Sequence, residues 1–289
     1  MKKMTRNRIT NIISTALLAF GLMLAVAHNA MAAGTPSGTS VGNIATINYS
    51  VDGTAQPEVG STEGGNTSGP GSETTFLVGT IINLTLIEGN TTHTSVAAGS
   101  LLQATSFTLT NLGNDSQGYN LTAANSALAV FGEADDFDVG TFAYYSDNNN
   151  DGLLDALDTL ITSVNSLAPD GSIDLLVTAT IPNNQPDNQT SAISLTAVTT
   201  ADGTTVPAAE TGGAFDSTLV AIVFGDGSTT TDLTIGDPGQ TEGDATAVAL
   251  DQYHVLTAAL TVSKTVAVYS DPANGTTVPK AIPGAILTY

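Results

Sequence analysis

The chain has 289 residues, 41% of them hydrophobic, and carries a formal net charge of −21 with no cysteine. Its 27 acidic residues are opposed by six basic ones, and beyond the first eight positions the basic residues are only Lys264 and Lys280. Such a chain has no basic patch for nucleic acid or for an anionic membrane surface, and without disulfides its stability must come from core burial, bound metal or neighbouring domains.

The N-terminus has the pattern of a secretory signal peptide. Basic residues between Lys2 and Arg8 precede an apolar run from Ile12 to Ala27, and Ala30–Ala32 supplies small residues for cleavage. The apolar run is shorter than the roughly 20 residues that a spanning helix needs. We therefore predict that residues 1–32 are removed and that the mature chain, with no membrane span, is exported to the extracellular space or the cell envelope surface.

Residues 33–74 are expected to hold an N-terminal strand followed by a linker. Apolar side chains alternate from Ile44 to Val51, which predicts the strand. Residues 52–74 are rich in Gly, Ser, Thr, Glu and Pro, a composition that is typical of a flexible linker or long loop.

Residues 75–205 are predicted to form an antiparallel, immunoglobulin-like β-sandwich. The clearest strand is Ile173–Ile181, in which apolar residues occupy every second position. Shorter alternating segments are Phe107–Leu109, Tyr119–Leu121 and Ile193–Ala197. Turn residues such as Ala168–Gly171 separate these segments at intervals typical of a two-sheet sandwich, which argues against a parallel α/β enzyme fold. Only residues 153–161 have leucines at helical spacing.

One loop of this region matches the twelve-residue calcium-binding pattern, because residues 147–158 read Asp-Asn-Asn-Asn-Asp-Gly-Leu-Leu-Asp-Ala-Leu-Asp. The expected ligands, at positions one, three, five, seven, nine and twelve, are Asp147, Asn149, Asp151, Leu153 through its carbonyl, Asp155 and Asp158. Gly152 stands at position six, where the loop must turn. Asp158 reaches less far than the usual Glu, which leaves bidentate closure open. The alternative is a solvated, metal-free hairpin tip.

Other candidate residues give weaker patterns. Glu133, Asp135, Asp136 and Asp138 lie just upstream and can either approach the same loop or form a solvated acidic face. His93 and His254 stand alone in the sequence, so no zinc site is expected from them. No nucleophile elbow, phosphate loop or zinc-protease motif is present, and we do not expect an enzyme.

Residues 206–262 are expected to form a smaller β segment after a domain boundary in residues 200–214. A strand is predicted over Phe215–Phe224, and a strand pair near Ala247–Val262. An acidic, Gly-rich segment, residues 225–244, separates them.

The C-terminal run Leu260–Tyr289 contains the pieces Val-Ser-Lys-Thr and Lys-Ala-Ile-Pro-Gly-Ala and resembles the opening of a bacterial surface repeat, the domain-of-unknown-function 11 family. The segment Phe107–Asn114 is similar to a strand and turn of such immunoglobulin-like repeats. The resemblance implies a β-sandwich used as a spacer or adhesive element, with no catalytic residues. Residues 263–289 are then the opening strand of a following repeat in a longer protein, or they pack on their own chain or complete a neighbouring subunit by strand addition.

These features together predict an exported, acidic cell-surface structural or adhesive module, stabilised by calcium. Its expected partners are other surface-protein domains or subunits, or a glycan or ligand on a host or neighbouring cell. The alternatives are a carbohydrate-binding or carbohydrate-processing module, and an extracellular filament subunit. A groove lined by Tyr144, Tyr145 and nearby acidic residues would favour the carbohydrate alternative.

Overall fold

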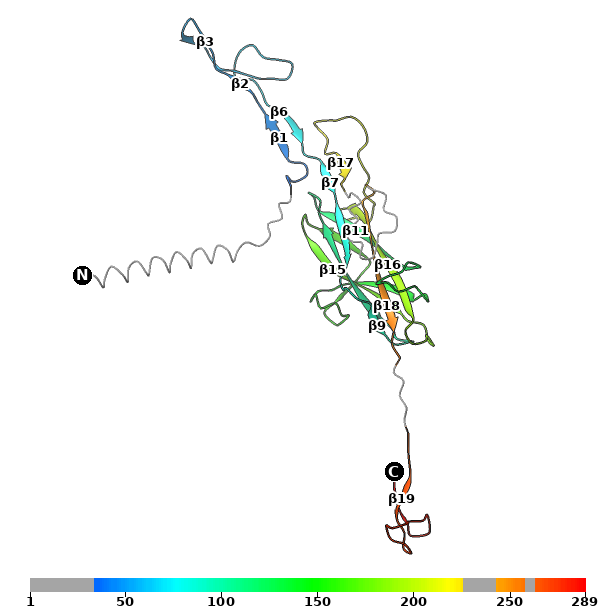
Figure 1. Cartoon of the computed structure of the whole chain (residues 1–289). Coiled ribbons are helices and arrows are strands. Elements are labelled where there is room, and N and C mark those ends of the chain that lie inside the picture. Colours follow the sequence, from blue (N-terminus) through cyan, green and yellow to red (C-terminus); the bar gives the residue numbers. More distant parts are fainter. Residues whose placement is uncertain (1–33, 226–242, 258–262) are drawn as a thin grey trace, which may run out of the picture.

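The protein is all-β, and its centre is a sandwich of two five-stranded sheets (Figure 1). The computed structural model describes residues 34–225, 243–257 and 263–289, so the predicted signal peptide lies outside the described residues. Within these ranges no helix is present, and hence none that could cross a membrane. The helical spacing at residues 153–161 was misleading, because this segment is a hairpin loop followed by a short strand.

The first sheet contains five strands with antiparallel neighbours throughout. In spatial order they are β13 (Thr159–Ile161), β12 (Gly140–Ser146), β15 (Ser172–Thr180), β10 (Gln103–Asn111) and β8 (Leu84–Glu88). The strand predicted from its strict alternation over Ile173–Ile181 is thus confirmed as β15, at the centre of this sheet.

The second sheet is antiparallel except at one edge, where β9 runs parallel to β18. In spatial order its strands are β14 (Ser163–Leu167), β11 (Gln117–Ser126), β16 (Thr190–Ala201), β18 (Thr246–Val255) and β9 (Thr94–Val96). The predicted immunoglobulin-like sandwich is therefore confirmed, with one parallel strand added to it.

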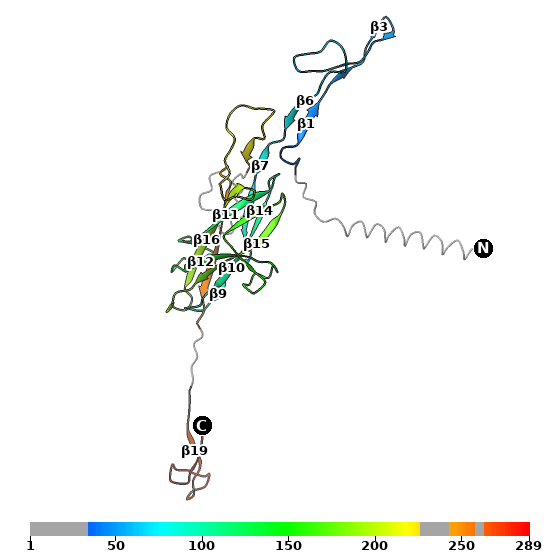
Figure 2. The same ribbon diagram turned by 180° about the vertical axis from the view of Figure 1, so that it is seen from behind.

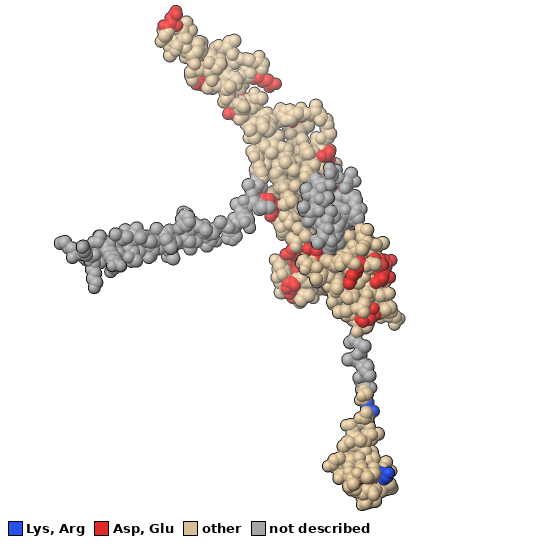
Figure 3. Space-filling model, in the orientation of Figure 1, with Lys and Arg blue, Asp and Glu red and all other residues tan. Residues whose placement is uncertain are grey.

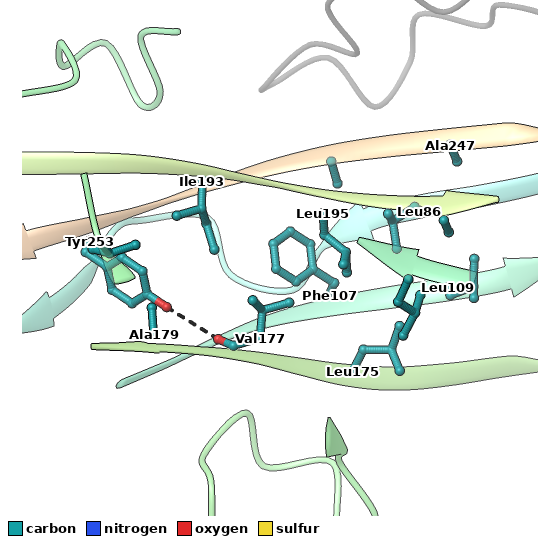
Figure 4. Close-up of a cluster of buried hydrophobic side chains, with 14 of the residues drawn as sticks. Leu86, Phe107, Leu109, Leu175, Val177, Ala179, Ile193, Leu195, Ala247 and Tyr253 are labelled. Atoms are coloured by element: carbon teal, nitrogen blue, oxygen red, sulfur yellow. Dashed lines mark hydrogen bonds between the residues drawn. The ribbon is translucent and has the colours of Figure 1, made fainter. Parts of the chain in front are cut away.

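The inner faces of the two sheets share one apolar core (Figure 4). Phe107 and Val177 of the first sheet and Ile193 and Tyr253 of the second are all completely buried there. The Tyr253 hydroxyl also crosses the sandwich, since it donates to the Gln103 carbonyl at 2.9 Å and lies 3.4 Å from the Val177 carbonyl. Burial raises the pKa of this hydroxyl, so it remains a donor under ordinary conditions.

The sandwich extends further along the chain than its predicted end at residue 205. The sequence predicts β18 in a separate smaller segment, residues 206–262, but β18 pairs with β16 over nine register partners from Thr190↔His254 to Val198↔Thr246. The strand expected over Phe215–Phe224 is reduced to β17 (Ile222–Phe224), which runs parallel to β7 (Thr80–Ile82). Of the expected pair near Ala247–Val262, β18 is the strand described.

The predicted N-terminal linker is a hairpin arm rather than an irregular segment. The chain pairs with itself in three steps: β1 (Ser40–Asn43) with β6 (Thr74–Leu77), β2 (Thr46–Ile47) with β5 (Val59–Gly60), and β3 (Ser50–Val51) with β4 (Thr54–Ala55). Asp52 and Gly53 form the tip with φ of 49° and 76°, the left-handed values that a two-residue hairpin turn requires. Figures 1 and 2 show this arm reaching away from the sandwich.

The C-terminal residues form a second small hairpin. Strand β19 (Ala267–Ser270) pairs with β20 (Ile286–Thr288), and Lys264 Nζ lies 4.4 Å from the centre of the Tyr289 ring. The Asp271 carboxylate accepts the backbone N–H groups of Ala273 and Asn274, both at 2.7 Å, which fixes the turn after β19.

One carboxyl group lies inside the apolar layer. Asp251 is fully buried on the same face of β18 as Ala249 and Tyr253. Its Oδ1 accepts the Gln252 N–H at 2.6 Å, but its Oδ2 has no partner among the described residues. Desolvation raises the pKa of Asp251 well above its ordinary value, and the charge of Glu88 adds to this.

The raised pKa predicts that stability falls as pH rises. Between the unfolded pKa of Asp251 and its higher folded pKa, the folded state holds a proton that the unfolded state has lost, so unfolding becomes easier with increasing pH. We expect Asp251→Asn to stabilise the protein by about 1–3 kcal/mol at pH 7 and very little at pH 4, as measured by urea unfolding. The exposed Asp202→Asn removes the same charge and serves as the control. An equal gain in both variants would show that overall charge, rather than burial, is responsible.

Candidate metal centre

The Asp-rich loop is the tip of the hairpin between β12 and β13. Register partners Ser146 and Thr159 close the hairpin, and residues 147–158 lie between them. All six predicted calcium ligands therefore belong to one loop held at both ends by the first sheet.

Asp147 organises the loop from its base. The side chain is buried, and its Oδ1 accepts the N–H of Asn150 at 2.7 Å while its Oδ2 accepts that of Gly152 at 2.8 Å. Asn150 and Gly152 have φ of 56° and 71°, so the chain turns back on itself through left-handed conformations. Gly152 suits this turn, because a residue without Cβ adopts positive φ at little cost.

Three of the predicted ligands meet at one point above this base. Asn149 Nδ2 donates to Asp151 Oδ2 at 2.9 Å and lies 3.3 Å from Asp155 Oδ2. Positions three, five and nine of the loop thus converge on the Asn149 amide. Rotation of that amide exchanges its donor for an oxygen, and the three side chains then offer the hard oxygen donors that calcium prefers.

The last two predicted ligands occupy different places. Asp158 accepts the Asn148 N–H at 3.2 Å and the Asp155 N–H at 2.8 Å, so its carboxylate braces the returning half of the loop. Leu153, predicted to bind through its carbonyl, is 67% exposed. The donor set of the loop fits calcium, with Asp147 and Asp158 also shaping the backbone.

A polar cavity of about 360 Å³ adjoins the loop. Its lining combines Asp147 and Asp151 with Asp174, which projects from the outer face of β15 and accepts the Thr108 hydroxyl at 2.6 Å. Sequence reasoning missed Asp174, although its place between the inward-facing Ile173 and Leu175 marks it as outward-facing.

The aromatic groove that would favour a carbohydrate site is not formed by Tyr144. This side chain packs against the sandwich core, and its hydroxyl accepts the Ala123 N–H at 2.8 Å across to the second sheet. The described residues that line the cavity include no aromatic side chain.

The acidic residues upstream hold a different part of the molecule. Asp135 Oδ1 accepts the Ala192 N–H at 2.9 Å, and Asp136 Oδ2 accepts the Thr190 N–H at 3.0 Å. Both therefore attach their segment to β16 of the second sheet instead of approaching the Asp-rich loop. Burial raises the pKa of Asp135, although the Ala192 N–H opposes this.

The expectation that the two histidines stand alone is wrong. His254 Nδ1 lies 2.9 Å from His93 Nε2, and His93 Nδ1 lies 3.6 Å from Glu133 Oε2. The two histidines are 161 positions apart in sequence, and only the pairing of β9 with β18 brings them together. No spacing rule in the sequence could have indicated this cluster.

Comparisons with known proteins give distant likenesses. No family model and no curated protein matches the chain. Among solved structures, the ASH/PapD-like domain of human CEP192 is 9% identical, with 61% of this chain and 85% of that chain covered, at a TM-score of 0.25. The CupB6 tip adhesin from Pseudomonas aeruginosa is 12% identical, with 47% and 48% covered and a TM-score of 0.25. AvmM, which catalyses macrocyclization in alchivemycin A biosynthesis, is 9% identical, with 65% and 95% covered and a TM-score of 0.26. At TM-scores this low the likenesses carry no argument about function.

The hydrogen bonds of Asp147 predict a large effect of its removal even without calcium. Asp147→Ala removes the acceptor of the Asn150 and Gly152 N–H groups, which are part-buried, and we expect a loss of about 1–3 kcal/mol in unfolding free energy measured in chelator. Asp155→Ala removes an exposed carboxylate of the same loop and is expected to cost less than about 1 kcal/mol. Equal losses in the two variants would contradict the anchoring role of Asp147.

Proposed function

We propose that the protein is an exported cell-surface structural or adhesive module that contacts neighbouring subunits through its N-terminal arm and is rigidified by calcium in the β12–β13 loop. The observation that carries the proposal is the arm formed by residues 40–77, an extended hairpin that projects from a sandwich with a complete core of its own. An element that adds nothing to the core is well placed to serve in contacts with another molecule.

The arm exposes large apolar side chains. Ile47, Val51 and Tyr49 are 64%, 53% and 45% exposed. Grouped apolar side chains on a soluble domain favour association, and the short strands of the arm also present free backbone edges. Both features support contact with a neighbouring subunit of the same surface assembly.

The excess of acidic side chains also supports the proposed cell-surface function. In Figure 3 acidic side chains gather over the sandwich, while the basic side chains of the described residues lie in the C-terminal part of the chain, residues 263–289. An excess of one sign keeps such a module soluble and attracts divalent cations. In the Asp-rich loop, a bound calcium ion relieves the repulsion among Asp147, Asp151 and Asp155.

A triple change, Ile47→Ser, Tyr49→Ser and Val51→Ser, tests the arm. We expect the parent protein to form concentration-dependent assemblies in sedimentation velocity and electron microscopy, and we expect the variant to stay monomeric with an unchanged melting temperature. The control changes three exposed apolar residues outside the arm, Leu101, Val206 and Leu219, to Ser. A parent that stays monomeric, or a control that behaves like the arm variant, would overturn the proposed role of the arm.

Calcium titration with a thermal-melt readout tests the loop. Binding to the folded state alone stabilises by about 2.7 kcal/mol at a calcium concentration one hundred times the dissociation constant. We expect millimolar calcium to raise the melting temperature of the parent and to leave Asp151→Ala nearly unchanged, with exposed Asp202→Ala responding like the parent. The calcium assignment fails if Asp151→Ala gains as much as the parent.

A further inference from the structure

A second cluster of metal-binding side chains lies on the outer face of the second sheet, well separated in sequence from the Asp-rich loop. His254 occupies β18, and its even-numbered neighbour Leu250 packs with Val130, Ala192 and Phe131 rather than with the core between the sheets. His93 directly precedes β9, whose residue Ser95 is the register partner of His254. The parallel pairing at this edge of the sheet thus fixes the two histidines side by side.

The two imidazole rings face each other through their nitrogens. His254 Nδ1 and His93 Nε2 are 2.9 Å apart, the ring centres are 4.2 Å apart, and the ring planes meet at 80°. Two imidazole nitrogens this close together either share one proton in a hydrogen bond or bind the same metal ion. A tetrahedral zinc ion at roughly 2.0–2.1 Å from each nitrogen sets them roughly 3.3 Å apart, so an opening of a few tenths of an ångström admits the ion.

Glu133 approaches the pair from the other side of His93. Its Oε2 lies 3.6 Å from His93 Nδ1, and metal-binding atoms of the three residues all lie within 4.8 Å of one another. A carboxylate at the far nitrogen of a metal-bound imidazole fixes the tautomer and the orientation of the ring. His93 is therefore arranged to present Nε2 to an ion while Nδ1–H faces Glu133.

The turn that carries Glu133 is held in an unfavourable conformation. Val130 and Glu133 exchange two backbone hydrogen bonds, of 3.1 and 2.9 Å, across Phe131 and Gly132, whose φ values are 51° and 83°. Positive φ is strained for a bulky residue such as Phe131, and its packing against the small apolar cluster of Val130 and Leu250 keeps it in place. The fold thus places Glu133 beside His93.

One oxygen of the Glu133 carboxylate has no hydrogen-bond donor among the described residues. The side chain is 41% exposed, yet its Oε2 is buried and accepts no hydrogen bond within the described part of the chain. Buried carboxylate oxygens are normally satisfied, and an ion or a charged donor nearby accounts for an exception. His93 polarised by a metal ion is such a donor.

We propose that His93 and His254 bind a zinc-class divalent metal ion, with Glu133 orienting His93. Imidazole nitrogens favour zinc, copper and nickel over calcium, so this site and the oxygen-lined loop select different ions. The His93 side chain is 29% exposed, which leaves the ion reachable from solvent and its remaining positions open to water or to an external ligand.

Cobalt and zinc titrations of the mature chain test this assignment. We expect one cobalt ion per chain to give a visible absorption spectrum that zinc abolishes and millimolar calcium does not. His93→Gln and His254→Gln are expected to lose the spectrum. Glu133→Ala is expected to weaken binding about 10–100-fold with no change in the melting temperature of the metal-free protein, because the carboxylate acts through His93.

Two control variants separate this site from other acidic groups. Asp187 lies near His254, but its Oδ1 accepts the Thr257 N–H at 2.7 Å, so Asp187→Asn should change zinc affinity only a few-fold through the loss of charge. Asp151→Ala in the calcium loop should leave zinc binding intact. The proposal is overturned if zinc does not bind at millimolar concentration, if the histidine variants bind as well as the parent, or if Asp151→Ala abolishes binding.

Discussion

The apolar layer between the two sheets is the constraint on which the rest of the molecule depends. Without disulfides, the chain is held by the contact of side chains such as Phe107 and Ile193 from opposite sheets, together with the Tyr253 hydroxyl that crosses between them. Burial of apolar surface supplies the main driving force, at about 25 cal/mol per Å². The layer also tolerates unpaired polar groups, above all the buried carboxyl of Asp251, whose cost the surrounding apolar contacts outweigh.

Both candidate metal centres take their geometry from this sandwich. The Asp-rich loop is fixed by the closing pair of β12 and β13, and Asp147 at its base adds backbone hydrogen bonds that set the turn. The histidine pair is fixed by the register of β9 against β18. Side chains on loops and strand edges keep their positions when the register of the strands beneath them is fixed. A register shift of one residue is unfavourable here, because it would turn every side chain of the strand to the other face of the sheet.

Periodicity in the sequence predicted the fold where one face of a strand is buried, as in Ile173–Ile181. The spacing of Asp147–Asp158 indicated a loop in which three of the predicted calcium ligands, Asn149, Asp151 and Asp155, do meet. Pairings over long separations were not predictable. Strand β18 follows β16 after more than forty intervening residues, and nothing local marks it as a member of the same sheet. The leucines near residue 157 have helical spacing, yet they lie in a loop and are exposed. Asp and Asn side chains accept the backbone N–H groups of this loop, as Asp155 accepts that of Leu157, and these hydrogen bonds replace those of a helix. The Asp52-Gly53 pair is typical of a two-residue hairpin turn, but the Gly- and Ser-rich residues that follow it favour a linker, so the hairpin arm was not predicted.

Hydrogen exchange of the backbone amides tests the central claim most directly, because it reports which strands open together. A single sandwich core predicts that β10, β15, β16 and β18 show the same slowest exchange, limited by global unfolding. The arm strands β2 and β3 should exchange much faster. Rapid exchange of β18 while β16 remains protected would contradict the account, because it would mean that the second sheet ends at β16 and that the apolar layer closes without Tyr253.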